Sequence, residues 1–366
     1  MADKLNVAIV FGGKSGEHEV SLMSAKSVIE AIDKTKYKIT LIGIDKIGVW
    51  HIGDQTSLLL NQDNIETITL NTHTPIITIF STGKEVYLVD HTSNTKLTTI
   101  DVFFPLTHGT FGEDGCIQGM IELTGAAYVG AGVLGSSICM DKDVMKRLLR
   151  DSNLPIANFL VLKSHTYRDA PLDQIIATLS LPIFVKPVNL GSSVGITKAH
   201  TKEELEKAIE IAFIYDNKVI LEENIISREL EVSVLGNDEP KASLPGEIVP
   251  HQEFYSYEAK YNEGGSDIII PAKLSDLQIK HLQKLALDTY QTLECVGLAR
   301  VDFFMTSEGE FFINELNTLP GFTKTSVYPM LWEASGISYQ KLIDMLIDLA
   351  QSEKHKKANL IRNYLS

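Results

Sequence analysis

The chain has 366 residues, 44% of them hydrophobic and 22% charged, which is the balance of an ordinary globular protein with about two to three domains. Its formal net charge of −14 argues against a general nucleic-acid-binding or anionic-membrane surface. No apolar run is long enough for a signal peptide or a membrane span, and Cys116, Cys139 and Cys295 lack disulfide or zinc spacing. We therefore expect a cytoplasmic protein whose three cysteines are reduced and buried, with neither nucleic acid nor membrane as a partner.

Strand and helix patterns alternate through the first part of the chain. Buried strands are predicted at residues 6–11, 38–44, 100–106 and 126–130. Helices are predicted just after the opening loop and over residues 116–123. This alternation predicts a mostly parallel, doubly wound sheet within an N-terminal α/β domain, residues 1–140. Residues 51–98, which contain short strands, are interpreted as an insertion without an assigned role.

The pattern changes after a helix predicted over residues 141–155. Strands are predicted at residues 182–187, 219–224, 230–236, 299–305 and 310–316, and the last two form a hairpin with a glycine in its turn. Helices are predicted at residues 202–212, 274–293 and 339–350. Residues 247–265 have no clear period, so we interpret them as a long functional loop. The C-terminal half is therefore predicted to be α+β.

The stretch "FGGKSGEHEVSLMSA", Phe11–Ala25, begins like a phosphate-binding loop. A Walker A loop would need a glycine where Ala8 stands, and the spacing GxGxxG is absent. Glu17 and Glu19 would also repel a phosphate at the start of the following helix. Two interpretations stay open: the carboxylates are favoured there by the helix dipole alone, or one of them faces the ammonium group of a ligand.

The strongest local signal is the predicted hairpin "ARVDFF" and "INELN". Arg300 and Asp302 share one face of a strand, as do Glu315 and Asn317 on the next. Oxygen ligands that converge in this way suit Mg²⁺, with phosphate oxygens completing its coordination. The alternative is a structural arginine–carboxylate pair across the sheet. After the hairpin, "PG" leaves the backbone N–H of Gly321 available for an oxyanion.

Lysines and glycines follow the strand that ends at Lys186. The loop "NLGSSVG", residues 189–195, is rich in backbone donors and can fold over a polyphosphate. Lys142 and Lys260 are further candidates for phosphate contacts, although an isolated lysine is usually only solvated. Residues 221–224, "LEEN", end another strand and form a reasonable edge for adenine and ribose.

Together these motifs resemble the D-alanine–D-alanine ligase family of ATP-grasp ligases over nearly the full chain. The resemblance rests on six ordered motifs: "GGKSGEHEVSLMSA", "HGTFGEDGCIQGMIELTGAAYVGAGVLGSSICMDK", "FVKPVNLGSSVGI", "YEAKY", "ARVDFF" and "FINELNTLPGFTKTSVYP". It implies an ATP-grasp fold. Residues 1–140 would form the substrate domain, residues 141–224 the central ATP-grasp subdomain, and residues 225–366 the C-terminal subdomain with an omega loop and the metal site.

The resemblance also implies roles for substrate-binding and catalytic residues. Glu17 would bind the ammonium group of the first D-alanine, and Ser192 and Tyr261 would hydrogen-bond with it and close two loops over the site. Further substrate contacts are implied for His108, at the first carboxylate, and for Ser326 with the backbone near Val327, at the second. The tetrahedral intermediate would be stabilised by Arg300 and the Gly321 N–H.

ATP and metal ligands are implied in the same way. The phosphates would be bound by the glycine-loop and lysine residues Ser192, Ser193, Lys142, Lys186 and Lys260. The adenosine moiety would contact Glu222, Glu223, Ile225, Glu229 and Phe254. Two Mg²⁺ ions, with Mn²⁺ as a substitute, would be held by Asp302, Glu315 and Asn317.

The implied reaction is ligation of two D-alanines through D-alanyl phosphate, with release of ADP and phosphate, for bacterial peptidoglycan precursors. Tyr261 favours the dipeptide over D-alanyl-D-lactate, since depsipeptide-forming relatives usually lack this tyrosine. Lys324 stands where many relatives have Ser or His. A homodimer is expected from the family. Three alternatives remain: a sister ATP-dependent carboxylate–amine ligase, a dinucleotide-dependent dehydrogenase, and a nucleotide-binding module without catalysis.

Overall fold

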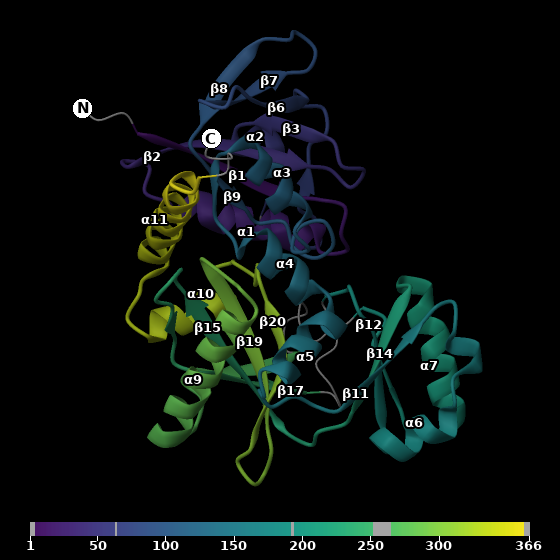
Figure 1. Ribbon diagram of the computed structural model, residues 1–366. Coiled ribbons are helices and arrows are strands. Elements are labelled where there is room, and N and C mark those ends of the chain that lie inside the picture. The colour runs from purple at the N-terminus through teal and green to yellow at the C-terminus, as the bar shows by residue number, and fades with distance from the viewer. Residues whose placement is uncertain (1–3, 63, 192–193, 252–264, 362–366) are drawn as a thin grey trace.

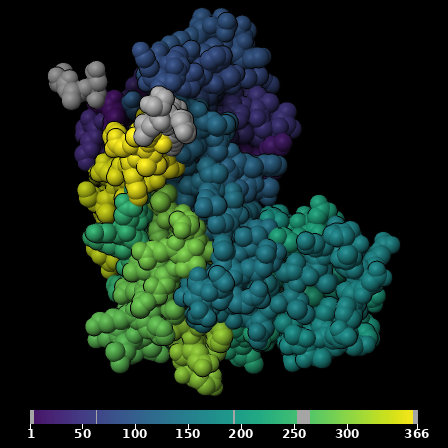
Figure 2. All heavy atoms as spheres, viewed as in Figure 1, coloured from purple at the N-terminus to yellow at the C-terminus, as the bar shows by residue number. Residues whose placement is uncertain are grey.

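The computed structural model of the chain describes residues 4–62, 64–191, 194–251 and 265–361. Figure 1 shows three lobes: an N-terminal lobe in purple and blue, a central lobe in teal, and a C-terminal lobe in green and yellow. In Figure 2 the central lobe projects to one side of the other two. No helix in the described ranges is both long and apolar enough to cross a membrane.

The N-terminal lobe is built on a five-stranded sheet in the order β10-β9-β1-β2-β3. Its strands are β1 (Leu5–Gly12), β2 (Tyr37–Ile44), β3 (Trp50–Gly53), β9 (Val102–Pro105) and β10 (Ala127–Tyr128). Neighbouring strands are parallel except β2 and β3. Alternate residues of β1 enter different cores, because successive side chains of a strand point to opposite faces. Helices α1 (His18–Ala31) and α3 (Cys116–Thr124) cover the two faces, so the predicted doubly wound sheet is confirmed.

The predicted insertion packs on both faces of this sheet, and its Leu58 and Ile68 are buried in the core that α1 covers. It contains helix α2 (Gln55–Leu58) and the strands β4 (Leu59–Leu60), β5 (Thr69–Leu70), β6 (Ile77–Ser81), β7 (Val86–Asp90) and β8 (Lys96–Ile100). Ile77 and Leu88 are buried in the same core as Phe103 of β9. The insertion therefore supplies part of the hydrophobic cover of the N-terminal sheet.

The central lobe is a four-stranded antiparallel sheet in the order β11-β14-β12-β13. Its strands are β11 (Phe159–Lys163), β12 (Ile183–Pro187), β13 (Thr197–Ala199) and β14 (Lys218–Glu223). Two helices, α6 (Leu172–Leu179) and α7 (Lys202–Tyr215), pack on it and share its core, and a short 3₁₀ turn spans Tyr167–Asp169. The Thr201 hydroxyl caps α7 by accepting a hydrogen bond from the Glu204 N–H, which fixes where that helix begins.

The C-terminal lobe contains a six-stranded antiparallel sheet in the order β18-β17-β15-β19-β20, with β16 paired to β15. Its strands are β15 (Arg228–Leu235), β16 (Lys241–Ala242), β17 (Gly246–Pro250), β18 (Ser266–Ile269), β19 (Leu298–Met305) and β20 (Phe311–Asn317). Helix α9 (Asp276–Thr292) shares a core with β15, β19 and β20. The hairpin of β19 and β20 confirms the pairing that the sequence predicted.

Helices connect the lobes. Helices α4 (Gly132–Met140) and α5 (Lys142–Asp151) join the N-terminal lobe to the rest, and α10 (Val327–Ala334) precedes α11 (Tyr339–Ala358). Neither α4 nor α10 was predicted from the sequence. Helix α11 runs beyond the predicted end at Ala350, and its apolar face packs in the core of the first sheet (Figure 1). The last helix of the chain therefore completes the first lobe.

The cysteines only partly match the prediction. Cys139 and Cys295 are buried free thiols with their Sγ atoms 3.7 Å apart. Cys116 is exposed, which corrects the expectation that all three are buried. It occupies the first position of α3, where Ile117 and Ile121 take the inward face.

Candidate active site

The central and C-terminal lobes enclose a cavity of about 410 Å³. Many of the predicted ATP and metal residues line it: Lys142, Lys186, Glu222, Glu223, Ile225, Glu229, Asp302 and Glu315. They come from helix α5, from the central sheet and from the C-terminal sheet. The fold thus brings segments far apart in the sequence to the wall of one cavity.

The β19–β20 hairpin places its polar residues on one face. Arg300 lies opposite Asn317, and Asp302 lies opposite Glu315. The Arg300 guanidinium donates to both Asp302 oxygens at 2.7 Å, and the Asn317 amide donates to Asp302 Oδ2 at 2.9 Å. Burial alone would lower the pKa of Arg300, but the carboxylates of Asp302 and Glu231 raise it well above its ordinary value. The arginine–carboxylate pair left open by the sequence therefore forms, and Glu315 faces it across the hairpin.

The same face supplies the chemistry that a divalent cation requires. In the described ranges, no group of three or more His, Cys, Asp or Glu side chains is arranged to hold a metal by itself. Mg²⁺ needs fewer protein ligands, since it keeps several waters and binds one or two carboxylates with substrate phosphates. The carboxylates of Asp302 and Glu315 line the cavity together, so the donor set fits Mg²⁺ in the presence of a polyphosphate.

A buried carboxylate between two lysines forms the opposite wall. The Glu222 oxygens lie 2.8 Å from Lys146 Nζ and 2.5 Å from Lys186 Nζ. Burial would raise the pKa of Glu222, but the charges of Lys146 and Lys186 lower it to about 2. Burial likewise opposes the charged form of Lys186, yet Glu222 raises the pKa of that lysine. Glu222 is thus a fixed anion that holds Lys186 protonated at the cavity wall.

Lys146 was missed in the sequence. Burial lowers its pKa, and its attraction to Glu222 only partly offsets that effect. The available signal was its spacing: Lys146 lies one helical turn after Lys142 on α5, so both point to the same side. Lys142 Nζ donates to the Leu190 carbonyl at 2.7 Å and lies 3.7 Å from Glu315 Oε2. Lys142 therefore sits between the glycine loop and the hairpin.

The predicted adenosine residues lie where β14 and β15 meet the cavity. The Glu223 carboxylate accepts hydrogen bonds from the backbone and side chain of Asn158 at 2.7 and 2.9 Å. The Ile225 carbonyl accepts from the Ser227 hydroxyl at 3.2 Å. Glu229 lies in the middle of the sheet, paired with strands β17 and β19 on either side. The Glu223 carboxylate is therefore occupied by hydrogen bonds to Asn158, and residues 222–229 form part of the cavity wall.

Glu17, from the N-terminal lobe, lies beside a residue of the cavity lining. It is the N-cap residue of α1, and its side chain makes no capping hydrogen bond. Glu17 Oε2 packs closely against Gly109: a Cβ atom added to this glycine would lie only 2.6 Å from the oxygen, so a side chain there would clash. The same oxygen is 3.3 Å from the Cβ position of Gly191, which itself lines the cavity. The Glu17 carboxylate therefore lies next to Gly191, which lines the same cavity as the hairpin residues Asp302 and Glu315.

His108 is buried between the N-terminal lobe and the loop after β20. Its Nδ1 lies 3.0 Å from the Leu319 carbonyl and must donate there, and its Nε2 lies 3.0 Å from the Ser24 hydroxyl. Burial would lower the pKa of His108, whereas Glu113, 3.6 Å away, raises it. The pKa of Glu113 is raised by burial and by the nearby charge of Glu17. These contacts join the loop that carries Gly321 to the Glu17 side of the cleft.

The loop from Gly321 to Ser326 leads into α10. The Ser326 hydroxyl accepts a hydrogen bond from the Thr323 N–H at 3.0 Å and lies 3.1 Å from the Cβ position of Gly321. Val327, the first residue of α10, is buried. Within the described ranges the Gly321 N–H has no hydrogen-bond partner, so it is available as a donor.

Comparisons with known proteins agree with this geometry. Sequence profiles described as "D-ala D-ala ligase N-terminus" and "D-ala D-ala ligase C-terminus" match residues 6–131 and 148–348. The chain belongs to the D-alanine–D-alanine ligase family. It is 50% identical to a "D-alanine--D-alanine ligase" of Shouchella clausii, with 98% of each chain covered. It is 47% identical to "D-alanine--D-alanine ligase A" of Escherichia coli, with 98% of this chain and 99% of that one covered.

Solved structures place the chain in the ATP-grasp fold of this ligase family. The D-alanine–D-alanine ligase from Coxiella burnetii superposes with a TM-score of 0.86 at 36% identity, over 99% of this chain and 98% of that one. The VanG D-Ala:D-Ser ligase from Enterococcus faecalis gives 0.83 at 36% identity, over 95% of this chain and all of that one. The predicted ATP-grasp fold is therefore confirmed.

Five predicted site residues of this ligase-family member lie outside the described residues. They are the glycine-loop and omega-loop residues Ser192, Ser193, Phe254, Lys260 and Tyr261.

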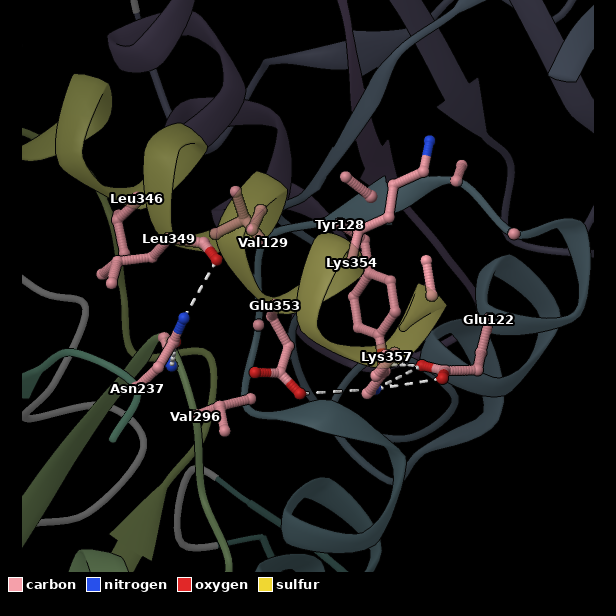
Figure 3. Close-up of a pocket in the computed structure, with 17 residues that line it drawn as sticks. Glu122, Tyr128, Val129, Asn237, Val296, Leu346, Leu349, Glu353, Lys354 and Lys357 are labelled. Atoms are coloured by element: carbon pink, nitrogen blue, oxygen red, sulfur yellow. Dashed lines mark hydrogen bonds and ion pairs between the residues drawn. The ribbon is translucent and has the colours of Figure 1, made fainter. Parts of the chain in front are cut away.

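A second cavity, of about 190 Å³, lies between β10, α11 and the loop at Val296 (Figure 3). At one side Lys357 forms an ion pair with both Glu122 oxygens, at 2.9 and 3.0 Å, and the Tyr128 hydroxyl donates to Glu122 at 2.7 Å. As far as the chain is described, its lining includes none of the predicted site residues. These contacts tie the last helix to the N-terminal lobe, so we assign the cavity to lobe packing.

Proposed function

We propose that this chain joins two molecules of D-alanine into D-alanyl-D-alanine at the expense of ATP, through a D-alanyl phosphate intermediate. The single observation that carries this proposal is the position of the Glu17 carboxylate, from the first lobe, beside Gly191, which lines the 410 Å³ cavity together with the lysines and hairpin carboxylates described above. A carboxylate suits the ammonium group of an amino acid, and the lysines suit phosphates. One cleft therefore has the chemistry for both substrates.

Activation comes first because a carboxylate has oxide as its leaving group and is a poor electrophile. An oxygen of the first D-alanine attacks the γ-phosphorus, the bond to ADP breaks, and an acyl phosphate forms. In such transfers the protein mainly positions the reactants and neutralises charge. Lys142 and Lys186, which line the cavity, would offset phosphate charge. Mg²⁺, held by Asp302, Glu315 and Asn317 and replaceable by Mn²⁺, would supply the remaining positive charge.

In the second step the amine of the second D-alanine attacks the acyl carbon. The tetrahedral intermediate carries negative charge on oxygen, and it collapses with loss of phosphate and a proton from the amine. We assign stabilisation of this oxyanion to Arg300 and the free Gly321 N–H. Ser326 and the start of α10 at Val327 would bind the second carboxylate, and His108 would orient the loop that joins the two substrate sites.

The remaining expectations form part of the same proposal. Ser192, Ser193 and Lys260 would cover the phosphates, Phe254 the nucleotide, and Tyr261 would close the omega loop over Glu17. We place the reaction in the cytoplasm, where ATP is supplied, as a step toward peptidoglycan precursors. We also propose a homodimer, as expected for this family, which analytical ultracentrifugation would test.

The second substrate needs a direct test, since one relative of similar structure is named a D-Ala:D-Ser ligase. The names of the relatives at 47–50% identity support the dipeptide D-alanyl-D-alanine over D-alanyl-D-lactate. Purified protein should release phosphate with ATP and D-alanine, and not with L-alanine. In mixtures with D-serine or D-lactate, D-alanyl-D-alanine should dominate at neutral pH. Dominant depsipeptide or D-alanyl-D-serine would refute the assignment of the second substrate.

A further inference from the structure

Glu231 is a buried carboxylate that no motif singled out. It lies on β15 directly opposite Asp302 of β19, so both side chains are on the face of the sheet that lines the cavity. Only 5% of its surface is exposed. Three carboxylates, Glu231, Asp302 and Glu315, act electrostatically on one guanidinium, that of Arg300.

Two of these carboxylates lie close to the same nitrogen of Arg300. Arg300 Nε lies 2.7 Å from Asp302 Oδ1 and 3.1 Å from Glu231 Oε2. The hydrogen bond is made to Asp302, which also accepts from the second branch of the guanidinium. Glu231 therefore lies within hydrogen-bond distance of the Arg300 Nε–H group, although this group donates to Asp302.

The proposed reaction places opposing demands on Asp302. As a metal ligand it must direct an oxygen at a divalent cation, which weakens that oxygen as an acceptor for Arg300. The cation also repels the guanidinium, because both carry positive charge. Without a second anion, Arg300 would leave the position in which it faces the oxyanion.

We propose that Glu231 is the positioning residue for Arg300. It holds the guanidinium at the cavity wall when Asp302 is engaged by the metal, so that the arginine and the metal work in the same turnover. This inference rests on the proposed function, because it assumes that Arg300 meets the oxyanion and that Asp302 binds the metal.

The test compares Glu231→Gln with Glu231→Asp, Arg300→Ala and a matched control, Asp344→Asn. Asp344 is also a buried carboxylate paired with a cation, Lys36 at 2.7 Å, but it lies on α11 in the packing against the N-terminal lobe. Glu231→Gln should lower kcat by about 10- to 100-fold, the usual cost of losing an outer partner of a metal or catalytic group, with KM for ATP nearly unchanged. Glu231→Asp keeps the charge and should recover most of this loss.

Two further measurements do not depend on activity. Mn²⁺ titration followed by electron paramagnetic resonance, with ADP present, should show weaker Mn²⁺ binding in Glu231→Gln, because Arg300 then competes for Asp302. A crystal structure with Mg²⁺ and a nucleotide should show Arg300 hydrogen-bonded to Glu231. Asp344→Asn should lower the melting temperature while leaving both kcat and Mn²⁺ affinity unchanged.

The possible failures are distinguishable. If Arg300→Ala loses activity but Glu231→Gln keeps its kcat and Mn²⁺ affinity, the positioning role is overturned and the proposed function stands. If Arg300→Ala itself keeps a normal kcat, the oxyanion assignment under the proposed function is wrong. Two results from the crystal structure with Mg²⁺ and nucleotide would also overturn the inference. One is a metal bound directly to Glu231, and the other is an Arg300 that still donates both of its hydrogen bonds to Asp302.

Discussion

Glu222→Gln should strongly destabilise the central lobe. The carboxylate lies between Lys146 and Lys186, and its pKa falls from the ordinary 4.5 to about 2. Each pKa unit corresponds to about 1.4 kcal/mol, so the charged form of Glu222 contributes about 3 kcal/mol to stability near neutral pH. The amide keeps the shape but leaves two buried cations without their anion. Loss of one partner from a buried ion pair usually costs about 3–5 kcal/mol, which agrees in size.

The pH dependence of this loss has a defined sign. Because the folded-state pKa of Glu222 is depressed, its contribution is fully present above about pH 4.5 and is lost as pH falls through about 2. Urea unfolding of wild type and Glu222→Gln should therefore differ by about 3 kcal/mol at pH 7, and the difference should begin to shrink below about pH 4.5. Equal urea midpoints at pH 7 would show that Glu222 does not serve as the counter-ion of these lysines.

A double variant provides the control for this reasoning. Lys146→Met combined with Glu222→Gln removes one cation together with the anion, so only Lys186 remains buried and charged. Since an unpaired buried charge costs more than an absent pair, the double variant should be more stable than Glu222→Gln alone. If the loss of unfolding free energy in the double variant equals the sum of the losses in Lys146→Met and Glu222→Gln alone, Lys146 and Glu222 are not coupled.

The remaining predictions concern the substrate side of the cleft. Glu17→Gln should raise KM for D-alanine at the first subsite while leaving ATP affinity unchanged, as measured by steady-state kinetics and nucleotide titration; an equal loss for both ligands would contradict the ammonium role. Asp302→Asn should raise the Mg²⁺ concentration needed for half-maximal phosphate release, and an unchanged Mg²⁺ dependence would remove it from the metal site. Arg300→Ala should lower kcat by about 100- to 1000-fold with little change in KM for ATP, and a near-normal kcat would refute its oxyanion role.

Much of the fold was predictable because its strands and helices have strong local patterns. The parallel strands of the first lobe are continuous apolar runs, and the β19–β20 hairpin has alternating residues with a glycine turn at Gly309. Helix α4 was missed since its glycines and serines resemble a loop, and its stability comes from packing, with Gly135 against Cys295. The end of α11 was misplaced because its last turns are charged and carry no apolar stripe.

The candidate site was less predictable than the fold. Arg300 and Asp302 could be paired from their spacing on one strand, but the third carboxylate, Glu231, comes from a strand that neighbours β19 only in the folded sheet. Lys146 looked like an ordinary helical lysine until Glu222 was found beside it. Long-range register and burial, which depend on tertiary packing, decide these roles.

The arrangement of charge explains how a chain of net charge −14 can bind a polyphosphate. The cavity lining carries both Lys142 and Lys186 and the hairpin carboxylates Asp302 and Glu315, and Lys142 Nζ lies 3.7 Å from Glu315 Oε2. A triphosphate in this cavity could contact the lysines directly, whereas the carboxylates would repel it unless a cation offset their charge. Nucleotide and Mg²⁺ should therefore bind cooperatively. Reversal of the hairpin charge by Asp302→Lys should uncouple the two, so that ATP affinity no longer depends on Mg²⁺.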